Sequence, residues 1–369
     1  MTLYIDIHVL QTVPPSNLNR DDTGSPKTAT YGGVRRARVS SQAWKRAARR
    51  DFAGYLDRTE LGVRTKRAVE LLSNRICEHS PETDPVAAAA LAEVVLSKAG
   101  LKVKAARKAK EGDAPLTEYL VFFSNHQLDR LADLALATAA TAIDARAAKD
   151  AMNQQHSIDV ALFGRMVADD ASLNVDAACQ VAHALSTHAV STEFDYYTAV
   201  DDENPVEETG AGMIGTIEFD SATLYRYATI DVDELRRSLG DDDATARAVQ
   251  AFVRSFATSM PSGKQNTFAN RTAPDAVIVM SREDRPVNLV GAFEEAVRGQ
   301  DGYVAASCEA LAAYATDVDR AFGSGPTDTW ITRVGRRTDA LSLLGDTIAF
   351  DELVARVGQR TRIASTEQQ

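Results

Sequence analysis

Apolar and polar residues alternate in the first segment of the chain, LYIDIHVLQTV at residues 3–13. Ile5, Ile7 and Val9 fall on one side of this alternation, and the residues between them are polar or aromatic. A period of two is typical of a β-strand with one buried face. The pattern therefore predicts that the chain opens with a half-buried strand.

The next segment changes from loop to helix character. Residues Pro14 to Gly33 are rich in Pro, Asn, Asp, Ser and Gly, which favours a long loop. Ser40 or Ser41 can then supply the N-cap of a helix, because a hydroxyl oxygen accepts the N–H groups of the first turn. The apolar residues that follow recur at helical spacing and are expected to face a core: Trp44, Ala47, Ala48, Phe52 and Tyr55.

The middle of the chain has the composition of a helical insertion, because residues 60–180 are rich in Ala and poor in β-branched residues. From about Phe194 the pattern alternates again on both sides of the polar segment DDENPVEETGAG, which predicts a β-hairpin. A strand is predicted at residues 224–230, with Tyr225 and Tyr227 on one face. Three further elements are predicted: a helix at residues 244–259, an apolar strand at 276–280 and a helix at 305–322. This order predicts an α+β fold with a ferredoxin-like core interrupted by large insertions.

Composition places the chain among ordinary globular proteins, with 369 residues, 44% hydrophobic and 25% charged. No apolar run approaches the ~20 residues that a membrane helix needs, and the start lacks the features of a signal peptide. We therefore expect a cytoplasmic protein with no membrane partner. The three cysteines are widely separated and form no CxxC pair, so we expect neither a disulfide framework nor a metal site, and no cofactor.

Positive charge is concentrated in two segments although the net charge of the chain is −11. Residues 20–50 hold nine basic and two acidic residues, a net charge of +7, so the remainder carries −18. Residues 98–110 contain six basic residues and no acid. Local basic segments in an acidic protein indicate binding of a polyanion. The alternative for each segment is a solvated helix face.

The predicted helix after Ser41 itself favours an anion. Lys45 and Arg49 are one turn apart, as are Arg46 and Arg50, so like charges repel each other along its surface. A bound anion relieves this repulsion, and the free N–H groups at the start of a helix attract the same ligand.

Most catalytic motifs are absent from the sequence. Gly263-Lys264 does not fit a phosphate-binding P-loop, because Thr258 and Gln265 stand at positions that require Gly and Ser or Thr, and a helix precedes it. His183 and His188 are expected to flank an apolar helix end, where a core or capping role is favoured over metal ligation.

Paired aspartates are the remaining candidates for chemistry, at residues 21–22, 169–170 and 201–202. Carboxylate oxygens suit Mg²⁺, but solvated Asp is also ordinary in turns. Asp21 and Asp22 stay open as an enzymatic alternative because they neighbour the first basic segment.

Six segments together resemble the CasC family, the RNA-binding backbone subunit of the type I-E CRISPR Cascade complex. The segments are LNRDD (18–22), YGGVRRARVSSQAWKRAARR (31–50), DVALFGRM (159–166), AHALSTH (182–188), DYYTAVDD (195–202) and GTIEFDSATLYRYA (215–228). The resemblance runs to about Ala276 and is looser beyond. The aromatic RNP consensus of RRM domains is absent, so base stacking on the sheet is not expected.

The resemblance implies an RRM-like (ferredoxin-like) palm, a helical fingers insertion and a β-hairpin thumb. The implied boundaries are 1–59, 182–192 and 224–369 with a C-terminal tail for the palm, 60–181 for the fingers and 193–223 for the thumb. It also implies that several copies stack head to tail as a helical filament along one guide CRISPR RNA. The further partners would be the other Cascade subunits and target DNA, in antiviral defence.

A protein that holds any guide sequence should grip phosphate and sugar and leave the base edges free. By resemblance, seven residues line the palm for the RNA backbone: Arg20, Lys27, Ser40, Gln42, Lys45, Arg46 and Arg49. Met166 and the thumb residues Thr198, Ala199 and Val200 resemble the family's apolar wedge, which displaces a base; the alternative for Met166 is a core position. Four residues of the fingers are expected to steer target DNA by charge: Lys102, Lys104, Arg107 and Lys108.

Three functions therefore remain open. The first is a non-catalytic RNA-binding scaffold that presents the guide for pairing with target DNA. The second is a metal-dependent RNA endonuclease that uses Asp21 or Asp22, since related backbone subunits of other CRISPR types cut target RNA through a loop aspartate. The third is a free-standing single-stranded nucleic-acid binder that acts as a monomer.

Overall fold

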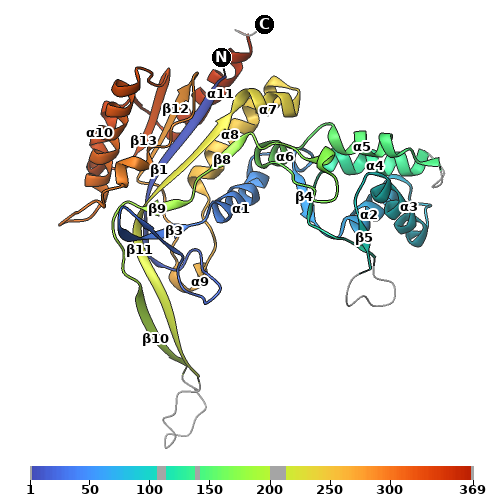
Figure 1. Cartoon of the computed structure of the whole chain (residues 1–369), viewed down its shortest axis with the longest axis horizontal. Helices are drawn as coiled ribbons and strands as arrows, with labels where there is room; N and C mark the ends of the chain where they lie inside the picture. The colour runs from blue at the N-terminus through green and yellow to red at the C-terminus, as the bar shows by residue number, and fades with distance from the viewer. Residues whose placement is uncertain (1, 106–113, 138–141, 200–212, 367–369) are drawn as a thin grey trace, which may run out of the picture. The chain divides into compact units, whose positions relative to one another are not determined.

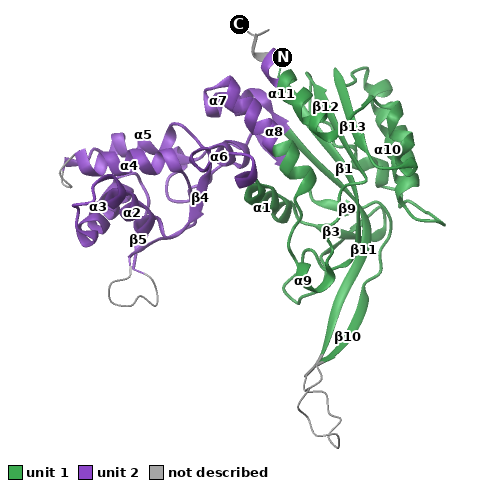
Figure 2. Ribbon diagram, turned by 180° about the vertical axis from the view of Figure 1, so that it is seen from behind, with its two compact units in different colours: residues 1–51, 181–229, 252–360 green, residues 52–180, 230–251, 361–369 purple. Residues whose placement is uncertain are grey.

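A computed structural model of the chain describes residues 2–105, 114–137, 142–199 and 213–366. The chain divides into two compact units, each built from segments that are far apart in the sequence. Figure 2 shows unit 1 (residues 1–51, 181–229 and 252–360) in green and unit 2 (residues 52–180, 230–251 and 361–369) in purple. Residues 230–251, which the resemblance assigns to the palm, group here with unit 2.

Unit 1 is organised around a large β-sheet with the strand order β14-β13-β12-β1-β11-β9-β3-β2 (Figure 1). Its strands are β1 (Tyr4–Ser16), β2 (Thr28–Tyr31), β3 (Val34–Val39), β9 (Ala184–Ser186), β11 (Met213–Asp231), β12 (Ala276–Arg282), β13 (Asp328–Arg333) and β14 (Asp346–Thr347). The first strand lies in the interior of this sheet, antiparallel to β12, with Ile7 opposite Val279.

Both faces of β1 are buried, so the prediction of a half-buried strand is wrong. Asp6 and His8 are as fully buried as Ile7. The Tyr227 hydroxyl donates to Asp6 Oδ1 at 2.8 Å, and the Tyr225 hydroxyl lies 2.8 Å from His8 Nδ1. The polar side chains of β1 thus hydrogen-bond within the protein and do not face solvent.

Helices cover the sheet of unit 1. They are α1 (Ser41–Asp51), α9 (Gln265–Phe268) and α10 (Val304–Phe322), with parts of α8 (Asp242–Thr258) and α11 (Phe350–Thr366). Tyr225 and Tyr227 share a hydrophobic core with α10, whereas Arg226 stacks on Trp44 of α1 and Phe256 of α8. The predicted alternation of faces along this strand is therefore confirmed.

The loop expected at Pro14–Gly33 is shorter than predicted, because β1 continues to Ser16 and β2 begins at Thr28. Strands β2 and β3 pair around Gly32 and Gly33, whose positive φ angles of 58° and 76° allow the turn. The sequence pattern missed both strands.

Arg36 of β3 does not belong to a basic surface, although it counts toward the charge of residues 20–50. Its side chain is fully buried. The guanidinium donates to the carbonyls of Tyr31, Ser186 and Phe293 at 2.8 to 3.2 Å. Arg36 therefore holds the turn and neighbouring strands together.

Unit 2 is mainly helical, as the sequence predicts for this region. Its helices are α2 (Ala68–His79), α3 (Pro85–Lys98), α4 (Asn125–Ala137), α5 (Ala145–Asn153), α6 (Ile158–Phe163) and α7 (Val232–Leu239). Leu72, Val95 and Leu131 lie in one core shared by α2, α3 and α4. Short strands that the pattern missed form two small sheets: β4 (Gly62–Thr65) with β7 (Val121–Ser124), and β5 (Val103–Lys104) with β6 (Leu116–Thr117). Strand β8 (Cys179–Val181) precedes β9.

The predicted hairpin is present. Strand β10 (Glu193–Ala199) pairs antiparallel with the first part of β11, from Glu193 opposite Phe219 to Ala199 opposite Met213. Because β11 continues into the large sheet, the two strands predicted on either side of Ser221 are one strand. The acidic segment 201–212 between β10 and β11 lies outside the described residues.

The architecture is thus a mixed α+β fold with a large sheet, as predicted at that level. No helix in the described parts of the chain is long and apolar enough to cross a membrane.

Candidate functional site

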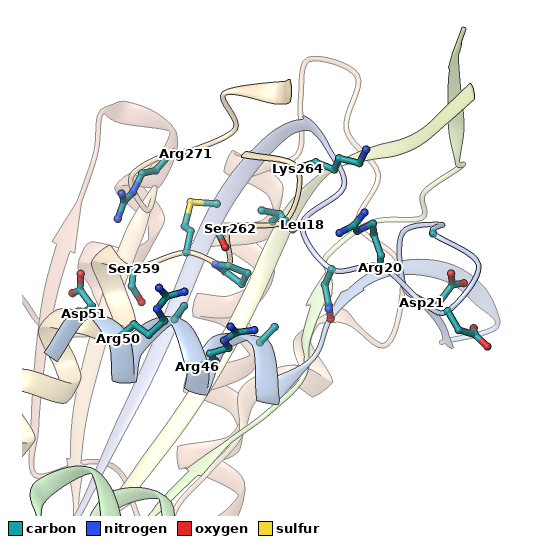
Figure 3. A pocket seen from close by; sticks show the side chains of 18 of the residues that line it. Leu18, Arg20, Asp21, Arg46, Arg50, Asp51, Ser259, Ser262, Lys264 and Arg271 are labelled. Carbon is teal, nitrogen blue, oxygen red and sulfur yellow. The ribbon is translucent and has the colours of Figure 1, made fainter. Parts of the chain in front are cut away.

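A groove of about 830 Å³ lies in unit 1 where three segments meet (Figure 3). Its walls are the loop of residues 18–24, one face of α1, and the loop of residues 259–264 that follows α8, together with Arg271. Figure 3 shows Arg46 and Arg50 projecting from α1 toward the loop that carries Ser259.

Positive charge predominates in this groove. None of its cations forms an ion pair with a carboxylate of the described residues. The cations are Arg20, Arg46, Arg50, Lys264 and Arg271, and the acids are Asp21, Asp22 and Asp51. Unpaired cations on several walls of one open groove attract an extended anion.

The loop that carries Arg20 is held by asparagine side chains and backbone bonds. Asn17 Nδ2 donates to the carbonyls of Gly24 and Glu218, both at 2.9 Å. Lys27 N–H donates to the Asn19 carbonyl, and Asn19 Oδ1 accepts the N–H of Ser40 at 2.9 Å. The loop is thereby tied both to β11 and to the start of α1.

Asp21 stabilises the turn of this loop. Its Oδ1 accepts the Thr23 hydroxyl at 2.7 Å and the backbone N–H groups of Thr23 and Ser25 at 2.9 and 3.0 Å. The hydrogen bond from the Thr23 side chain is the largest cause that lowers the pKa of Asp21. Asp22 is exposed. Within the described residues, no group of three or more His, Cys, Asp or Glu side chains lies together as metal ligands would.

Helix α1 begins where it was predicted to begin. Ser40 Oγ accepts the N–H of Ala43 at 3.3 Å, and His183 Nδ1 accepts the N–H of Ser41 at 3.1 Å. His183 thus has the capping role that the sequence favours, but the apolar helix end that His183 and His188 were expected to flank is wrong, because residues 184–186 form β9. Burial first, and then the charges of Arg38 and Lys27, lower the pKa of His183.

Only one of the basic residues predicted on α1 lines the groove. Arg46 does so, whereas Lys45 and Arg49 are half-buried and make interactions of their own. Arg50, one turn after Arg46, joins the groove although the sequence did not single it out as a ligand. Gln42 is exposed in the first turn.

The loop after α8 was not predicted as part of a site. Gly263 lies against the carbonyls of Asn17 and Leu18, where a Cβ would come within 2.7 Å of both oxygens, so a larger residue cannot fit. Lys264 and Ala269 flank α9 with positive φ angles of 50° and 45°, a strained conformation for residues other than glycine. The signal in the sequence is Gly263-Lys264, which does not fit a P-loop but supplies the glycine and the cation of this wall.

Lys27 lies beside the groove, where it lines a small neighbouring cavity with Arg38 and Asp220. Burial raises the pKa of Asp220 to about 6, and the charge of Arg35 opposes this rise.

The predicted wedge residues belong to different units. Met166 lies in unit 2 and its side chain is 80% exposed, which excludes the alternative of a core position. Thr198 is exposed on β10 in unit 1, and Ala199 ends that strand. Val200 lies outside the described residues. On the same strand as Thr198, Phe194 and Tyr196 are 66% and 63% exposed.

Two of the four predicted DNA-steering residues can be placed. Lys102 Nζ lies 3.3 Å from Asp169 Oδ1, and Lys104 Nζ lies 2.9 Å from Glu118 Oε1. The hydrogen bond with Glu118 is the largest cause that raises the pKa of Lys104. Arg107 and Lys108 lie outside the described residues. The second basic segment is therefore partly neutralised by carboxylates from other segments.

Comparison with known proteins places these features in context. The model of a family described as "CT1975-like protein" matches residues 5–356. A chain of a solved structure titled "CRISPR RNA-guided surveillance complex, pre-nicking" is 35% identical, with a TM-score of 0.87, over 97% of this chain and 100% of that one. A chain of another, "CRISPR RNA-guided surveillance complex", is 31% identical, with a TM-score of 0.75, over 97% of this chain and 99% of that one. No curated protein matches the chain.

Proposed function

The chain belongs to the CT1975-like protein family, and from this premise we propose that it is a guide-RNA-binding backbone subunit of a CRISPR RNA-guided surveillance complex. The observation that carries the proposal is the groove of unit 1, in which cations from three separate segments remain without carboxylate partners among the described residues. Similarity over nearly the whole length of two such complex-forming chains supports the same function.

The chemistry of the groove suits a sugar–phosphate backbone of any sequence. Arginine guanidinium groups and a lysine ammonium bind phosphate oxygens, and contacts to phosphate carry no information about the base. Arg20, Arg46 and Lys264 come from three different walls, so successive phosphates along one strand can each meet a cation. Lys27 and the exposed Gln42 in the first turn of α1 extend this path beside the groove. Ser40 supports the path indirectly, because its side chain is buried and caps α1.

The finer organisation that we propose is that of type I-E Cascade, with an RRM-like palm, helical fingers and a β-hairpin thumb. Copies would stack head to tail along the guide, so that Met166 of one subunit and the thumb residues Thr198 to Val200 of the next displace a base. The exposure of Met166 and Thr198 supports this arrangement, because a wedge must be free to contact RNA. The assembled filament would present the guide for pairing with target DNA in the cytoplasm.

We propose that the subunit is not itself an enzyme. Asp21 and Asp22 are the candidates for the alternative of a metal-dependent endonuclease, but one carboxylate oxygen of Asp21 already accepts three hydrogen bonds within its own turn. A carboxylate used in this way stabilises the loop that carries Arg20. Asp22 is exposed and remains the better candidate for the alternative.

The test is RNA binding by the purified full chain at several salt concentrations, with two single-stranded RNAs of unrelated sequence. We expect equal affinities for the two RNAs and a linear fall of log K with log salt. Each cation that contacts a phosphate releases a counterion from the RNA, and this release becomes less favourable as the salt concentration rises. A strong preference for one sequence, or binding that is indifferent to salt, would overturn the proposal. Incubation of the same complexes with complementary RNA and Mg²⁺ should leave that RNA intact, and evenly spaced fragments would support the endonuclease.

A further inference from the structure

Arg226 of β11 is a buried cation that the proposed function does not use. Its side chain is 1% exposed, and no carboxylate among the described residues pairs with it. A charge in this position is costly unless other groups compensate for it. The groups that stabilise the charge of Arg226 therefore show which parts of the fold this residue connects.

Two aromatic rings and two oxygen acceptors surround the guanidinium. Its central carbon lies 3.7 Å from the ring centroid of Trp44 and 4.5 Å from that of Phe256, so both rings stabilise the cation. One terminal nitrogen donates to Gln11 Oε1 at 2.6 Å, and the other donates to the carbonyl of Phe256. That carbonyl belongs to the last turn of α8, where the helix dipole also favours a positive charge.

Each of these contacts leads to a wall of the groove. Trp44 is buried on α1, whose outer side carries Arg46 and Arg50. The Phe256 carbonyl lies just before residues 259–272, a loop that is interrupted by the single-turn helix α9 and that brings Lys264 and Arg271 to the groove.

Gln11 extends the contact into this same loop. With its oxygen held by Arg226, its Nε2 donates to the carbonyl of Thr272 at 2.9 Å and lies 3.3 Å from Met260 Sδ. Gln11 therefore joins Arg226 to both ends of the loop that carries Lys264.

We infer that Arg226 is a positioning residue for RNA binding. Its buried guanidinium holds α1 and the loop of residues 259–272 at a fixed separation, which lets the cations of both walls contact one RNA strand. This inference rests on the proposed function of the groove. The guanidinium is suited to the task because its planar fork donates to two acceptors while its faces stack on two rings. Burial lowers its pKa to about 9, so it remains charged at neutral pH.

The test compares Arg226→Met with a matched control, Arg282→Met. Arg282 is equally buried in unit 1, but it pairs with Asp6 and Asp319 at 3.5 and 3.1 Å, and none of its polar contacts with described residues is to a residue that lines the groove. Both variants lose a buried charge and are expected to lose stability. Only Arg226→Met should also weaken RNA binding by about tenfold per folded molecule and flatten the slope of log K against log salt by about one unit or more. Arg226→Lys should restore part of the slope.

Gln11→Glu keeps the test decisive if Arg226→Met does not fold. A carboxylate at this position can still accept from Arg226, but it cannot donate to the Thr272 carbonyl. We therefore expect a folded variant with a flattened salt slope. A Trp330→Phe background leaves Trp44 as the only tryptophan, so its emission reports whether α1 has moved relative to the guanidinium.

The outcomes separate this inference from the proposed function. If the parent chain shows no salt-dependent RNA binding, the proposed function fails. If the parent binds as expected but Arg226→Met and Gln11→Glu keep its slope and affinity, or Arg282→Met flattens the slope equally, Arg226 has only a structural role.

Discussion

The imidazole Nδ1 of His183 accepts the backbone N–H of Ser41 at 3.1 Å. A side chain that precedes β9 thereby caps the first turn of α1, more than a hundred residues earlier in the sequence. Because Nδ1 is the acceptor, the proton of the neutral ring is on Nε2.

Protonation of His183 should therefore weaken the start of α1. The pKa of His183 is lowered in the folded state, so the unfolded chain takes up the proton more readily as the pH falls through the ordinary value of 6.5. The contribution of this cap is present above that pH and is lost below it. His183→Ala should lower the free energy of unfolding by about 1 kcal/mol at pH 8, measured by urea unfolding. The difference between variant and parent should shrink toward pH 5, and a constant difference would exclude the capping role.

Helix α1 offers a direct comparison of two basic pairs. Arg46→Ala with Arg50→Ala removes charge from the groove, and Lys45→Ala with Arg49→Ala removes charge from the adjoining face. We expect each double variant to weaken binding of all RNA sequences alike and to flatten the salt slope by about one unit per lost contact. Binding isotherms at several salt concentrations measure this. Unchanged binding after loss of Arg46 and Arg50 would remove the groove from the RNA path.

The fingers should affect capture of target DNA and not the guide. Lys102→Ala with Lys104→Ala should slow association with double-stranded DNA at low salt, because exposed charges act mainly on the association rate. A control variant with the opposite expected effect neutralises the carboxylates that pair with these lysines. Asp169→Asn with Glu118→Gln leaves both lysines unpaired and should speed association with DNA. Stopped-flow measurements on the guide-loaded complex test both variants. Equal rates for all three proteins at low salt would contradict DNA steering by these lysines.

His8 should make the fold sensitive to acid. Burial first, and then the charge of Arg282, lower its pKa to about 3, so stability is lost as the pH falls from 6.5 toward that value. The effect reaches about 3 kcal/mol near pH 4 for a single site. Asp6 acts in the opposite direction, because burial raises its pKa to about 6 and its protonation favours the folded state. His8→Gln should therefore lose less stability than the parent between pH 7 and 4 in denaturant titrations, and parallel curves would contradict this assignment.

Local signals in the sequence predicted local structure well. The Ser40 cap, the helix near 305–322 and most of the Trp44 stripe depend on neighbouring residues, and the structure has them. The stripe was wrong at its end, because α1 ends at Asp51 and Tyr55 is exposed. The burial of the polar face of β1 could not be predicted from local sequence. Tyr225 and Tyr227, which hydrogen-bond to His8 and Asp6, are more than two hundred residues away in the sequence.

The residues of the candidate site likewise divide into those that local sequence signals predict and those that only the fold brings together. Arg20 and Arg46 were predicted because they lie in one dense basic segment that also carries the family resemblance. Lys264 and Arg271 were missed because isolated cations become part of a site only when the fold brings their loop beside residue 18. Strand β9 was missed because it has only three residues, too few to show an alternating pattern of apolar and polar positions. It is a strand because it pairs with β3 and β11.

A shortened hairpin provides the variant for the central test. Replacing Asp195 to Ile217 by a short Gly/Ser linker removes the wedge but keeps Glu218, whose carbonyl accepts from Asn17 and so supports the Arg20 loop. We expect this variant to fold and to retain RNA affinity through the groove. Stacking along RNA should be lost, because a hairpin this long cannot be stable alone and should pack on a neighbouring copy.

The most direct measurement is the number of subunits bound per RNA by native mass spectrometry. The full chain is mixed with guide RNAs of unrelated sequence, one twice as long as the other. The account predicts that the longer RNA carries about twice as many copies, at the same number of nucleotides per copy for each sequence, and that the shortened hairpin abolishes this relation. One copy per RNA whatever its length, or copy numbers that follow sequence and not length, would contradict a backbone subunit that assembles along its guide.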